Sequence, residues 1–186
     1  LDVEYEDSLL FSLIDKKGRE LAKAYEGRQD LIVVASLVER IPNLAGLART
    51  CEVFKASALT VADKKILEDR QFKLISVTAE QWVPILEVKE GALIRYLERM
   101  KDEGYAVLGL EQTANSVAVN NYSFPSRVVL VLGREKDGIP VNLIQTLDAC
   151  LEIPQLGMIR SLNVHVSGAI AVWEYTKQHL QGGPGL

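Results

Sequence analysis

The chain has few of the residues that most often bind metals or form disulfides. Its 186 residues include only two cysteines, Cys51 and Cys150, and two histidines, His165 and His179. Neither cysteine has a Cys or His nearby, and no carboxylate–histidine spacing suits zinc. A disulfide stays open, but we favour two buried, reduced thiols because the composition is so poor in cysteine. We therefore expect no metal and an intracellular location, in the cytoplasm or the nucleus.

Two further absences narrow the class of protein. No run of about 18 apolar residues occurs, which argues against a membrane-spanning helix. Neither a GxGxxG pattern nor a phosphate-loop lysine motif is present, so the usual phosphate cradles of nucleotide-binding domains are missing. Methionine is scarce and the first residue is Leu1, from which we expect the chain to be part of a longer protein.

The chain also lacks an excess of positive charge. Its net charge is −4, from 21 Lys and Arg against 25 Asp and Glu, whereas proteins that grip a nucleic-acid backbone are usually basic. Positive side chains do gather in the N-terminal segment and near the motifs described below. They are Lys16, Lys17, Arg19, Lys23, Arg28, Arg127, Arg134, Lys136 and Arg160. An RNA-binding function would therefore depend on local charge or on another region of a longer protein.

What the sequence does contain is an alternation of strand and helix patterns. Continuous apolar runs over 31–36 and 127–132 are typical of strands buried on both faces. Further strands are expected near 58–61, 73–77, 105–110 and 150–153, with helices over 8–25, from 43, over 90–103 and at the C-terminus. With 48% apolar and 25% charged residues, this alternation predicts one α/β domain with a mostly parallel sheet flanked by helices.

Two short stretches place polar residues beside buried elements. Asn43 is a plausible N-cap for the helix that follows it, and Arg49 lies opposite that helix's apolar stripe. Taken alone, Arg49 is either a solvated surface arginine or a residue that faces a substrate or a partner subunit. In the loop 133–138, a glycine at each end allows positive φ or close backbone approach, and Glu135 lies between them.

A third stretch, 153–174, runs from a short strand through a loop into a long helix. Ser161 stands where the N-cap of this helix belongs, and Asn163 falls in its first turn. Either residue alone is an ordinary structural feature. One stripe of the helix is apolar: Leu162, Val166, Ala169, Ile170 and Trp173. We interpret Trp173 as a core or dimer-interface residue rather than a base-stacking platform.

Together the three stretches resemble a known family. Asn43–Thr50 (NLAGLART), Leu132–Pro140 (LGREKDGIP) and Ile153–Glu174 are similar, in order, to the three motifs of the SpoU (TrmH-like) RNA 2′-O-ribose methyltransferases of the SPOUT superfamily. The likeness covers about residues 31–179 and is most detailed for eukaryotic tRNA D-loop guanosine methyltransferases. It implies an α/β, SPOUT-type, mostly parallel sheet flanked by helices with a C-terminal deep trefoil knot. On this basis we expect an N-terminal helical extension (1–28), the methyltransferase domain (29–181) and a disordered tail (182–186).

The resemblance also implies an activity and its residues. The chain is expected to methylate a ribose 2′-hydroxyl of RNA, most specifically of a D-loop guanosine in tRNA, with S-adenosyl-L-methionine as donor. The implied catalytic residues are Arg49, Asn43, Glu135, Ser161 and Asn163. The implied cofactor-binding residues are Gly133, Ile153, Leu162, Leu132 and, less specifically, Gln112 and Thr113. Arginine is a poor base, so we expect Arg49 to position the RNA and stabilise charge, oriented by Asn43.

The implied partners are RNA, a second copy of the chain and an RNA-binding region N-terminal to it. The active site is then expected at the interface of a homodimer. The leading alternative is a non-catalytic SPOUT-like module for dimerisation or RNA recruitment, against which the complete motif set argues. A flavodoxin-like nucleotide binder is disfavoured by the missing phosphate-loop spacing.

Overall fold

The computed structural model describes residues 12–20, 26–159 and 161–180. Contacts divide the chain into two units, residues 1–28 with 184–186 and residues 29–183. In the first unit, residues 12–20 are helical. The expected helix over 8–25 is therefore confirmed in its central part, while its ends and the expected tail 182–186 lie outside the described residues. The second unit carries the features that follow.

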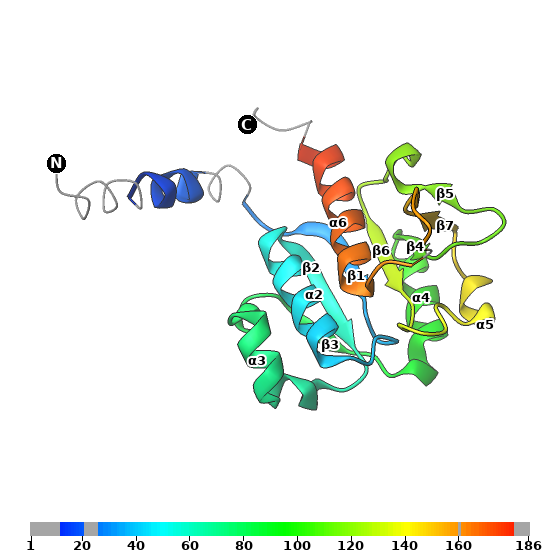
Figure 1. The fold of residues 1–186 in the computed structure, drawn as a ribbon, viewed down its shortest axis with the longest axis horizontal. Helices are drawn as coiled ribbons and strands as arrows, with labels where there is room; N and C mark the ends of the chain where they lie inside the picture. The colour runs from blue at the N-terminus through cyan, green and yellow to red at the C-terminus, as the bar shows by residue number, and fades with distance from the viewer. Residues whose placement is uncertain (1–11, 21–25, 160, 181–186) are drawn as a thin grey trace. The chain divides into compact units, whose positions relative to one another are not determined.

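The second unit is built on a seven-stranded sheet in the order β3-β2-β1-β6-β4-β7-β5, with every pairing parallel (Figure 1). The strands are β1 (Gln29–Val34), β2 (Ala56–Val61), β3 (Ile85–Glu87), β4 (Ala106–Leu110), β5 (Val117–Ala118), β6 (Val128–Leu132) and β7 (Ala149–Glu152). The central strand β6 is buried along its whole length, as strands covered on both faces are. The expected mostly parallel α/β sheet is confirmed.

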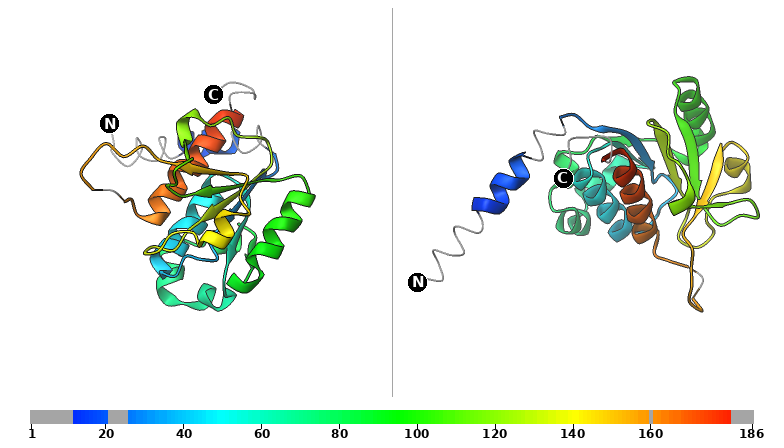
Figure 2. Two further views of the ribbon diagram at one scale, coloured as in Figure 1. Left: turned by 90° about the vertical axis from the view of Figure 1, so that its right-hand side faces the viewer. Right: turned by 90° about the horizontal axis from the view of Figure 1, so that it is seen from above.

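Helices cover both faces of this sheet, and the view from above separates the two layers (Figure 2). One face carries α2 (Ile41–Val53), α3 (Arg70–Ser76) and α6 (Val164–Leu180); the other carries α4 (Leu93–Asp102) and α5 (Val141–Ile144). Side chains alternate along β1, so Leu31 and Val33 pack on the first layer and Ile32 on the second. The 3₁₀ turns are η1 (Lys64–Glu68), η2 (Ala79–Gln81), η3 (Glu90–Ala92) and η4 (Val119–Asn121).

The strand expected near 73–77 is wrong, because this segment belongs to helix α3. Asp69 caps the helix by accepting hydrogen bonds from the amides of Gln71 (2.7 Å) and Phe72 (3.1 Å). Phe72 and Ser76, one helical turn apart, are the buried positions. A short apolar run fits a strand or a buried helix equally well, and here the cap and the tertiary packing decide for the helix.

Two expected N-caps are also wrong. Helix α2 begins at Ile41 with Arg40 in the cap position, so Asn43 lies inside the first turn with 7% of its surface exposed. Helix α6 begins at Val164, and its cap is Asn163 rather than Ser161. The Oδ1 atom of Asn163 accepts hydrogen bonds from the amides of His165 (2.9 Å) and Val166 (3.2 Å). Both asparagines therefore hold positions that a helix start fixes rigidly.

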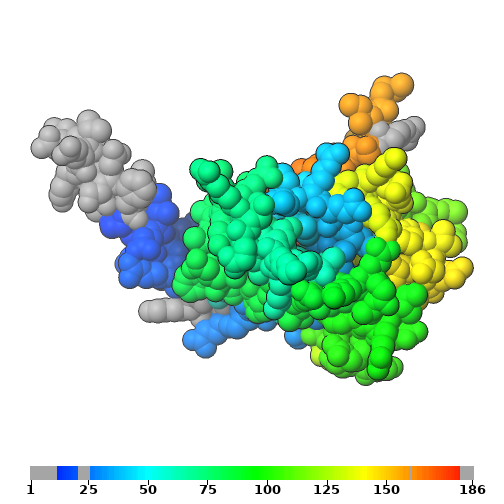
Figure 3. Space-filling view, turned by 90° about the horizontal axis from the view of Figure 1, so that it is seen from below, coloured from blue at the N-terminus to red at the C-terminus, as the bar shows by residue number. Residues whose placement is uncertain are grey.

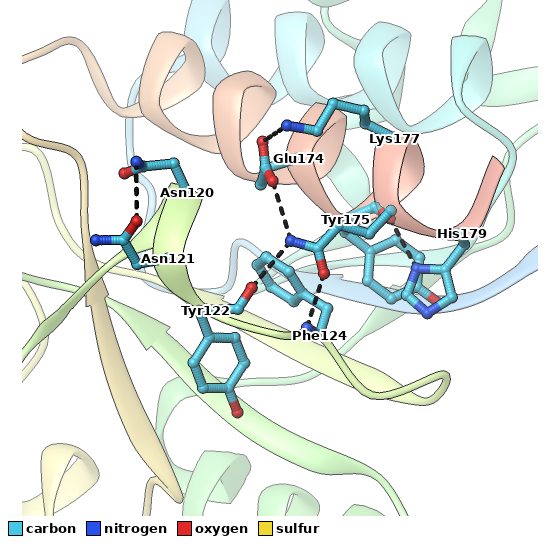
Figure 4. A network of polar contacts seen from close by, with 9 residues as sticks. Asn120, Asn121, Tyr122, Phe124, Glu174, Tyr175, Lys177 and His179 are labelled. Atoms are coloured by element: carbon cyan, nitrogen blue, oxygen red, sulfur yellow. Dashed lines mark hydrogen bonds and ion pairs between the residues drawn. The ribbon is translucent and has the colours of Figure 1, made fainter. Parts of the chain in front are cut away.

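Polar contacts fasten the C-terminal half of α6 to the segment 120–124 (Figure 4). The side-chain amide of Gln178 donates to the carbonyl of Tyr122 (2.9 Å) and accepts from the amide of Phe124 (2.9 Å). It also donates to Glu174 (3.0 Å), while the neighbouring Tyr175 is 2% exposed. Because this end of α6 is held, the N-terminal end of the helix has a fixed place at the carboxyl edge of the sheet.

Cys51 is buried, Cys150 is half-buried, and neither forms a disulfide. Among the described residues, no group of three or more His, Cys, Asp or Glu side chains gathers as metal ligands would. In the same part of the chain, no helix is both long and apolar enough to cross a bilayer.

Candidate active site

A pocket of about 640 Å³ opens at the carboxyl edge of the sheet. Its walls come from the residues that follow β4, β6 and β7, from the start of α2 and from the segment 161–167. The strand order runs from β1 through β2 to β3 on one side and from β6 through β4, β7 and β5 on the other. The pocket therefore lies at the topological switch point, where parallel α/β sheets usually bind ligands.

The fold brings most of the expected site residues into this pocket. Those that line it are Asn43, Leu132, Gly133, Glu135, Ile153, Ser161, Leu162 and Asn163. Thr113 does not: its neighbour Gln112 lines the pocket, while the amide of Thr113 donates to the hydroxyl of Ser116 (3.1 Å) in a turn. Arg49 also lies outside the pocket, exposed on α2.

Glu135, Asn43 and Asn163 form a continuous hydrogen-bonded chain that links all three motifs. The Nδ2 group of Asn43 donates to Oε1 of Glu135 (3.0 Å), and Nδ2 of Asn163 donates to Oδ1 of Asn43 (2.9 Å). Because Oδ1 of Asn163 caps α6, the amide groups of both asparagines have one favoured orientation. The chain therefore fixes the side chains on one wall of the pocket relative to the helices behind them.

Glu135 is held in its ionised form. Burial by itself would raise the pKa of its carboxyl, but hydrogen bonds from Asn43 and from the backbone amides of Arg40 and Glu39 outweigh burial and lower it. Those amides belong to the start of α2, where unpaired N–H groups favour a negative charge. Glu135 is therefore a fixed carboxylate at neutral pH rather than a proton donor.

The loop 133–139 is a tight turn with no room for added side chains. Arg134 and Gly138 exchange backbone hydrogen bonds (2.9 and 3.1 Å), and Gly138 has a φ of +68°. A Cβ atom on Gly133 would collide with the backbone of Gly138. At the end of the loop, the amide of Ile139 donates to the carboxylate of Glu111 (2.8 Å). The loop therefore offers its backbone to a ligand directly, as the paired glycines indicate.

Helices α2 and α6 meet closely behind the pocket. The imidazole of His165 covers Gly46, where a Cβ atom would collide with the ring. The Nε2 atom of His165 is 3.0 Å from the hydroxyl of Thr50, the residue after Arg49. Burial lowers the pKa of His165, so the imidazole is neutral at pH 7. This contact fixes the part of α2 that carries Arg49.

Some lining residues were missed by sequence reasoning: Arg40, Glu111 and Glu152. Glu111 could have been found, because it directly follows a buried strand at the edge where the other strands end. Glu152 had no such signal, because its contact with the hydroxyl of Ser116 (2.8 Å) is purely tertiary. Arg134 pairs with Glu90. Arg160, counted among the basic residues near the motifs, lies outside the described residues.

The loop after β7 presents apolar side chains to solvent. Figure 3 shows this segment, in orange, projecting from the molecular surface. Leu156, Met158 and Ile159 are 99%, 96% and 80% exposed. Exposed apolar groups that gather in this way commonly mark a binding surface.

These features define a class of protein. A switch-point pocket with a glycine-bounded loop, fixed amides and fixed carboxylates suits a small polar organic ligand held by side chains and backbone rather than a phosphate group. More particularly, the chain belongs to the SpoU rRNA Methylase family, which it matches over residues 30–173.

Individual relatives agree with this membership. The chain is 50% identical over 182 residues to a Mus musculus protein named tRNA (guanosine(18)-2′-O)-methyltransferase TARBP1. The matched region covers 98% of this chain but only 11% of that relative. The Aquifex aeolicus TrmH/SpoU tRNA modifying enzyme superposes with a TM-score of 0.76 at 26% identity, over 94% of this chain and 90% of that one. An AdoMet-bound rRNA methyltransferase from Sinorhizobium meliloti has a TM-score of 0.70 at 26% identity, over 84% and 58%.

Proposed function

We propose that the chain is an S-adenosyl-L-methionine-dependent RNA ribose 2′-O-methyltransferase that acts on guanosine 18 in the D-loop of tRNA. The observation that carries this proposal is the Glu135–Asn43–Asn163 hydrogen-bonded chain, which joins the three family motifs in one pocket. The tRNA guanosine substrate is supported by the activity in the name of the mouse relative, of which this chain spans 11%.

The pocket suits the proposed cofactor. Its volume of about 640 Å³ lies within the range of about 300–1,000 Å³ that is usual for small-molecule sites. S-adenosylmethionine has no phosphate, which fits a loop whose glycines bring backbone groups, rather than a phosphate cradle, to the ligand. Gly133, Leu132, Ile153 and Leu162 would hold it, and Gln112 would contact it rather than the expected Thr113. When bound, the cofactor supplies an activated methyl group on its sulfonium.

The residues of this chain would then align the reactants. Asn163, Asn43 and the fixed carboxylate of Glu135 orient the ribose, and Ser161 lies at the same wall. Alignment supplies much of the rate enhancement when the transferred group is already activated. Arg49, which stays charged at neutral pH, would hold an RNA phosphate and stabilise charge near the attacking hydroxyl.

A homodimer would bring Arg49 to the pocket of the other copy. Along α6, Val166, Ile170 and Trp173 form an apolar stripe that is 43%, 37% and 46% exposed, and Leu162, just before the helix, is 43% exposed. Trp173 lies against Phe54 at the end of α2, with the ring centroids 5.6 Å apart. Pairing two such faces would bury this stripe and place the exposed surface of α2, with Arg49, at the interface.

The remaining parts of the proposal extend the resemblance to the SPOUT enzymes. The C-terminal segment would form the deep trefoil knot of SPOUT domains, within a methyltransferase domain over 29–181, preceded by the extension 1–28 and followed by the tail 182–186. An RNA-binding region of a longer protein would supply the positive charge that this acidic chain lacks. The protein would act in the cytoplasm or the nucleus, where its tRNA substrate is found.

Two measurements test the proposal. Calorimetry should show one S-adenosylhomocysteine bound per chain, and labelled methyl groups should pass from S-adenosylmethionine to the ribose of guanosine 18 in total tRNA. Binding without transfer, both for this chain and for a longer protein that contains it, would favour the non-catalytic recruitment module. Absence of binding would contradict the methyltransferase proposal and would likewise favour the recruitment module.

A further inference from the structure

The start of α6 is bonded to α2 at two points. Helices α2 and α6 lie side by side (Figure 1). In the first turn of α2, Asn43 accepts a hydrogen bond from Nδ2 of Asn163 (2.9 Å). Two helical turns further on, the hydroxyl of Thr50 lies 3.0 Å from Nε2 of His165. Between these bonds the imidazole of His165 covers Gly46, where an added Cβ atom would collide with the ring.

These contacts share one face of α2. Residues three, four and seven positions apart lie on the same side of a helix, so Asn43, Gly46 and Thr50 face α6 together. A single hydrogen bond would let α2 roll about its axis or tilt. Two hydrogen bonds about 10 Å apart along the helix restrain both movements. They therefore set the direction in which Arg49, the neighbour of Thr50, projects from the helix.

Packing alone does not require the polar group of His165. An apolar side chain of similar size would also cover Gly46, and the two helices already approach closely at Gly168. The imidazole is only half-buried, yet its nitrogen reaches the residue next to Arg49. Within the described part of the chain, the exposed side chain of Arg49 has no hydrogen bond or ion pair of its own. The hydrogen bond of His165 is therefore the polar contact that holds this turn of α2.

We propose that His165 is a positioning residue for methyl transfer, which through the hydroxyl of Thr50 fixes the turn of α2 that presents Arg49 to the RNA. This inference rests on the proposed function and on the role proposed there for Arg49. Because a hydroxyl both donates and accepts, the bond to Nε2 forms with either tautomer of the neutral imidazole. His165 does not line the pocket, so it acts on the alignment of Arg49 and not on cofactor affinity.

The rate of methyl transfer to tRNA at saturating S-adenosylmethionine tests this role. His165→Leu still covers Gly46 but loses the hydrogen bond, and kcat should fall about tenfold because a small misalignment slows a positioned reaction. His165→Gln places an amide near the position of Nε2 and should bring kcat to within about threefold of wild type. In both variants, the KM for S-adenosylmethionine and the affinity for S-adenosylhomocysteine should stay within about twofold of wild type.

Double variants show whether His165 acts through its proposed partners. Thr50→Val removes the same hydrogen bond from the other side with little change in volume, so kcat should fall as it does in His165→Leu. The variant that combines the two changes should be no slower than either alone. When Arg49 is already replaced by alanine, His165→Leu should cause no further loss, because the group that it positions is gone.

His179→Leu is the matched control on the same helix. Its imidazole is also half-buried, and Nδ1 of His179 is bonded to the carbonyl of Tyr175 (2.7 Å), outside the pocket. The two substitutions each remove one hydrogen bond of α6, and thermal unfolding measures what each costs in stability. Only His165→Leu should lower kcat.

Three results would overturn the inference. They are an unchanged kcat in His165→Leu, a loss of S-adenosylhomocysteine binding in His165→Leu and His165→Gln alike, and a further loss when His165→Leu is added to Arg49→Ala. If neither this chain nor a longer protein that contains it transfers methyl groups to tRNA, the proposed function fails together with the inference. An active wild type with an equally active His165→Leu variant overturns the inference alone.

Discussion

One carboxylate holds separate segments of the pocket together. Glu135 follows β6, yet its acceptors are used by the backbone at the start of α2 and by Asn43, which in turn meets Asn163 at the start of α6. Hydrogen bonds to a charged group are stronger than those between neutral groups. At the scale of single residues, the site therefore depends on the charge of Glu135 as much as on its position.

The charge of Glu135 should make stability depend on pH in a defined direction, and Glu135→Gln should remove that dependence. The pKa of Glu135 lies below its ordinary value of 4.5, so its stabilising contribution is complete above about pH 4.5 and is lost as the pH falls through the lowered value. At pH 7, Glu135→Gln should lower the free energy of unfolding by about 1 kcal/mol, a modest figure because the carboxylate is only partly buried. Urea unfolding of both proteins at pH 7 and below pH 4.5 measures this. Glu98→Gln, at an exposed site, should show no such difference; a gap that grew in acid would contradict the assignment.

The structure of one chain does not explain the expected role of Arg49, because Arg49 does not line the pocket of that chain. We expect Arg49→Ala to reduce methyl transfer at least 100-fold, as loss of a charge-stabilising group does, and to leave S-adenosylhomocysteine affinity unchanged. Radiolabel transfer to tRNA and calorimetry give the two values. Arg70→Ala, another exposed arginine, is the control. An active Arg49→Ala enzyme would show that Arg49 is an ordinary surface residue.

At the scale of elements, the start of α6 has two functions in one side chain. Asn163 caps the helix with its Oδ1 atom and reaches Asn43 with its Nδ2 group. Capping α6 is a structural role for Asn163, whereas its hydrogen bond to Asn43 connects it to the pocket wall. The two functions can be separated because only the amide group can donate.

Asn163→Asp retains the acceptor that caps α6 but loses the donor to Asn43, whereas Asn163→Ala loses both. We expect Asn163→Ala to lower the free energy of unfolding by about 1 kcal/mol, the usual effect of removing an N-cap, and Asn163→Asp to lower it much less. Both should transfer methyl groups at least tenfold more slowly than wild type. Thermal unfolding and transfer rates measured on the same preparations test this. Full activity in Asn163→Asp would mean that the link to Asn43 has no part in the reaction.

At the scale of the whole molecule, α6 uses its two faces differently. Gly168, Ala171, Val172 and Tyr175 are buried against the sheet and α2, whereas the more apolar stripe through Ile170 and Trp173 faces solvent. The sequence pattern indicates that the helix has an apolar side. It does not indicate whether that side packs on the sheet of the same chain or on another molecule. This exposed stripe is the surface from which the proposed dimer gains its stability.

A charge placed in the stripe should therefore prevent pairing. We expect Ile170→Asp to shift the protein from dimer to monomer in sedimentation at micromolar concentration, because a carboxylate would be buried without a partner at the interface. Methyl transfer should fall with it, since Arg49 would no longer reach the second pocket. Leu74→Asp makes the same change at a 78% exposed position on α3 and should leave the dimer intact. A wild-type protein that sediments as a monomer would contradict the dimer itself.

Local patterns in the chain were sufficient for the class of fold, because strands buried on both faces and helices that alternate with them leave a clear periodicity in the sequence. They were also sufficient for the family, since the three motifs are contiguous stretches. The segment 73–77 escaped such reasoning, because a short apolar run fits a strand or a helix until its packing decides. The caps of α2 and α6 escaped it because the exact first residue of a helix is poorly fixed by local pattern. The tertiary structure alone brought Glu135, Asn43 and Asn163 together and placed His165 against Thr50. Distance in space, hydrogen-bond satisfaction and the face a helix buries are properties of the folded chain, and no local pattern contains them.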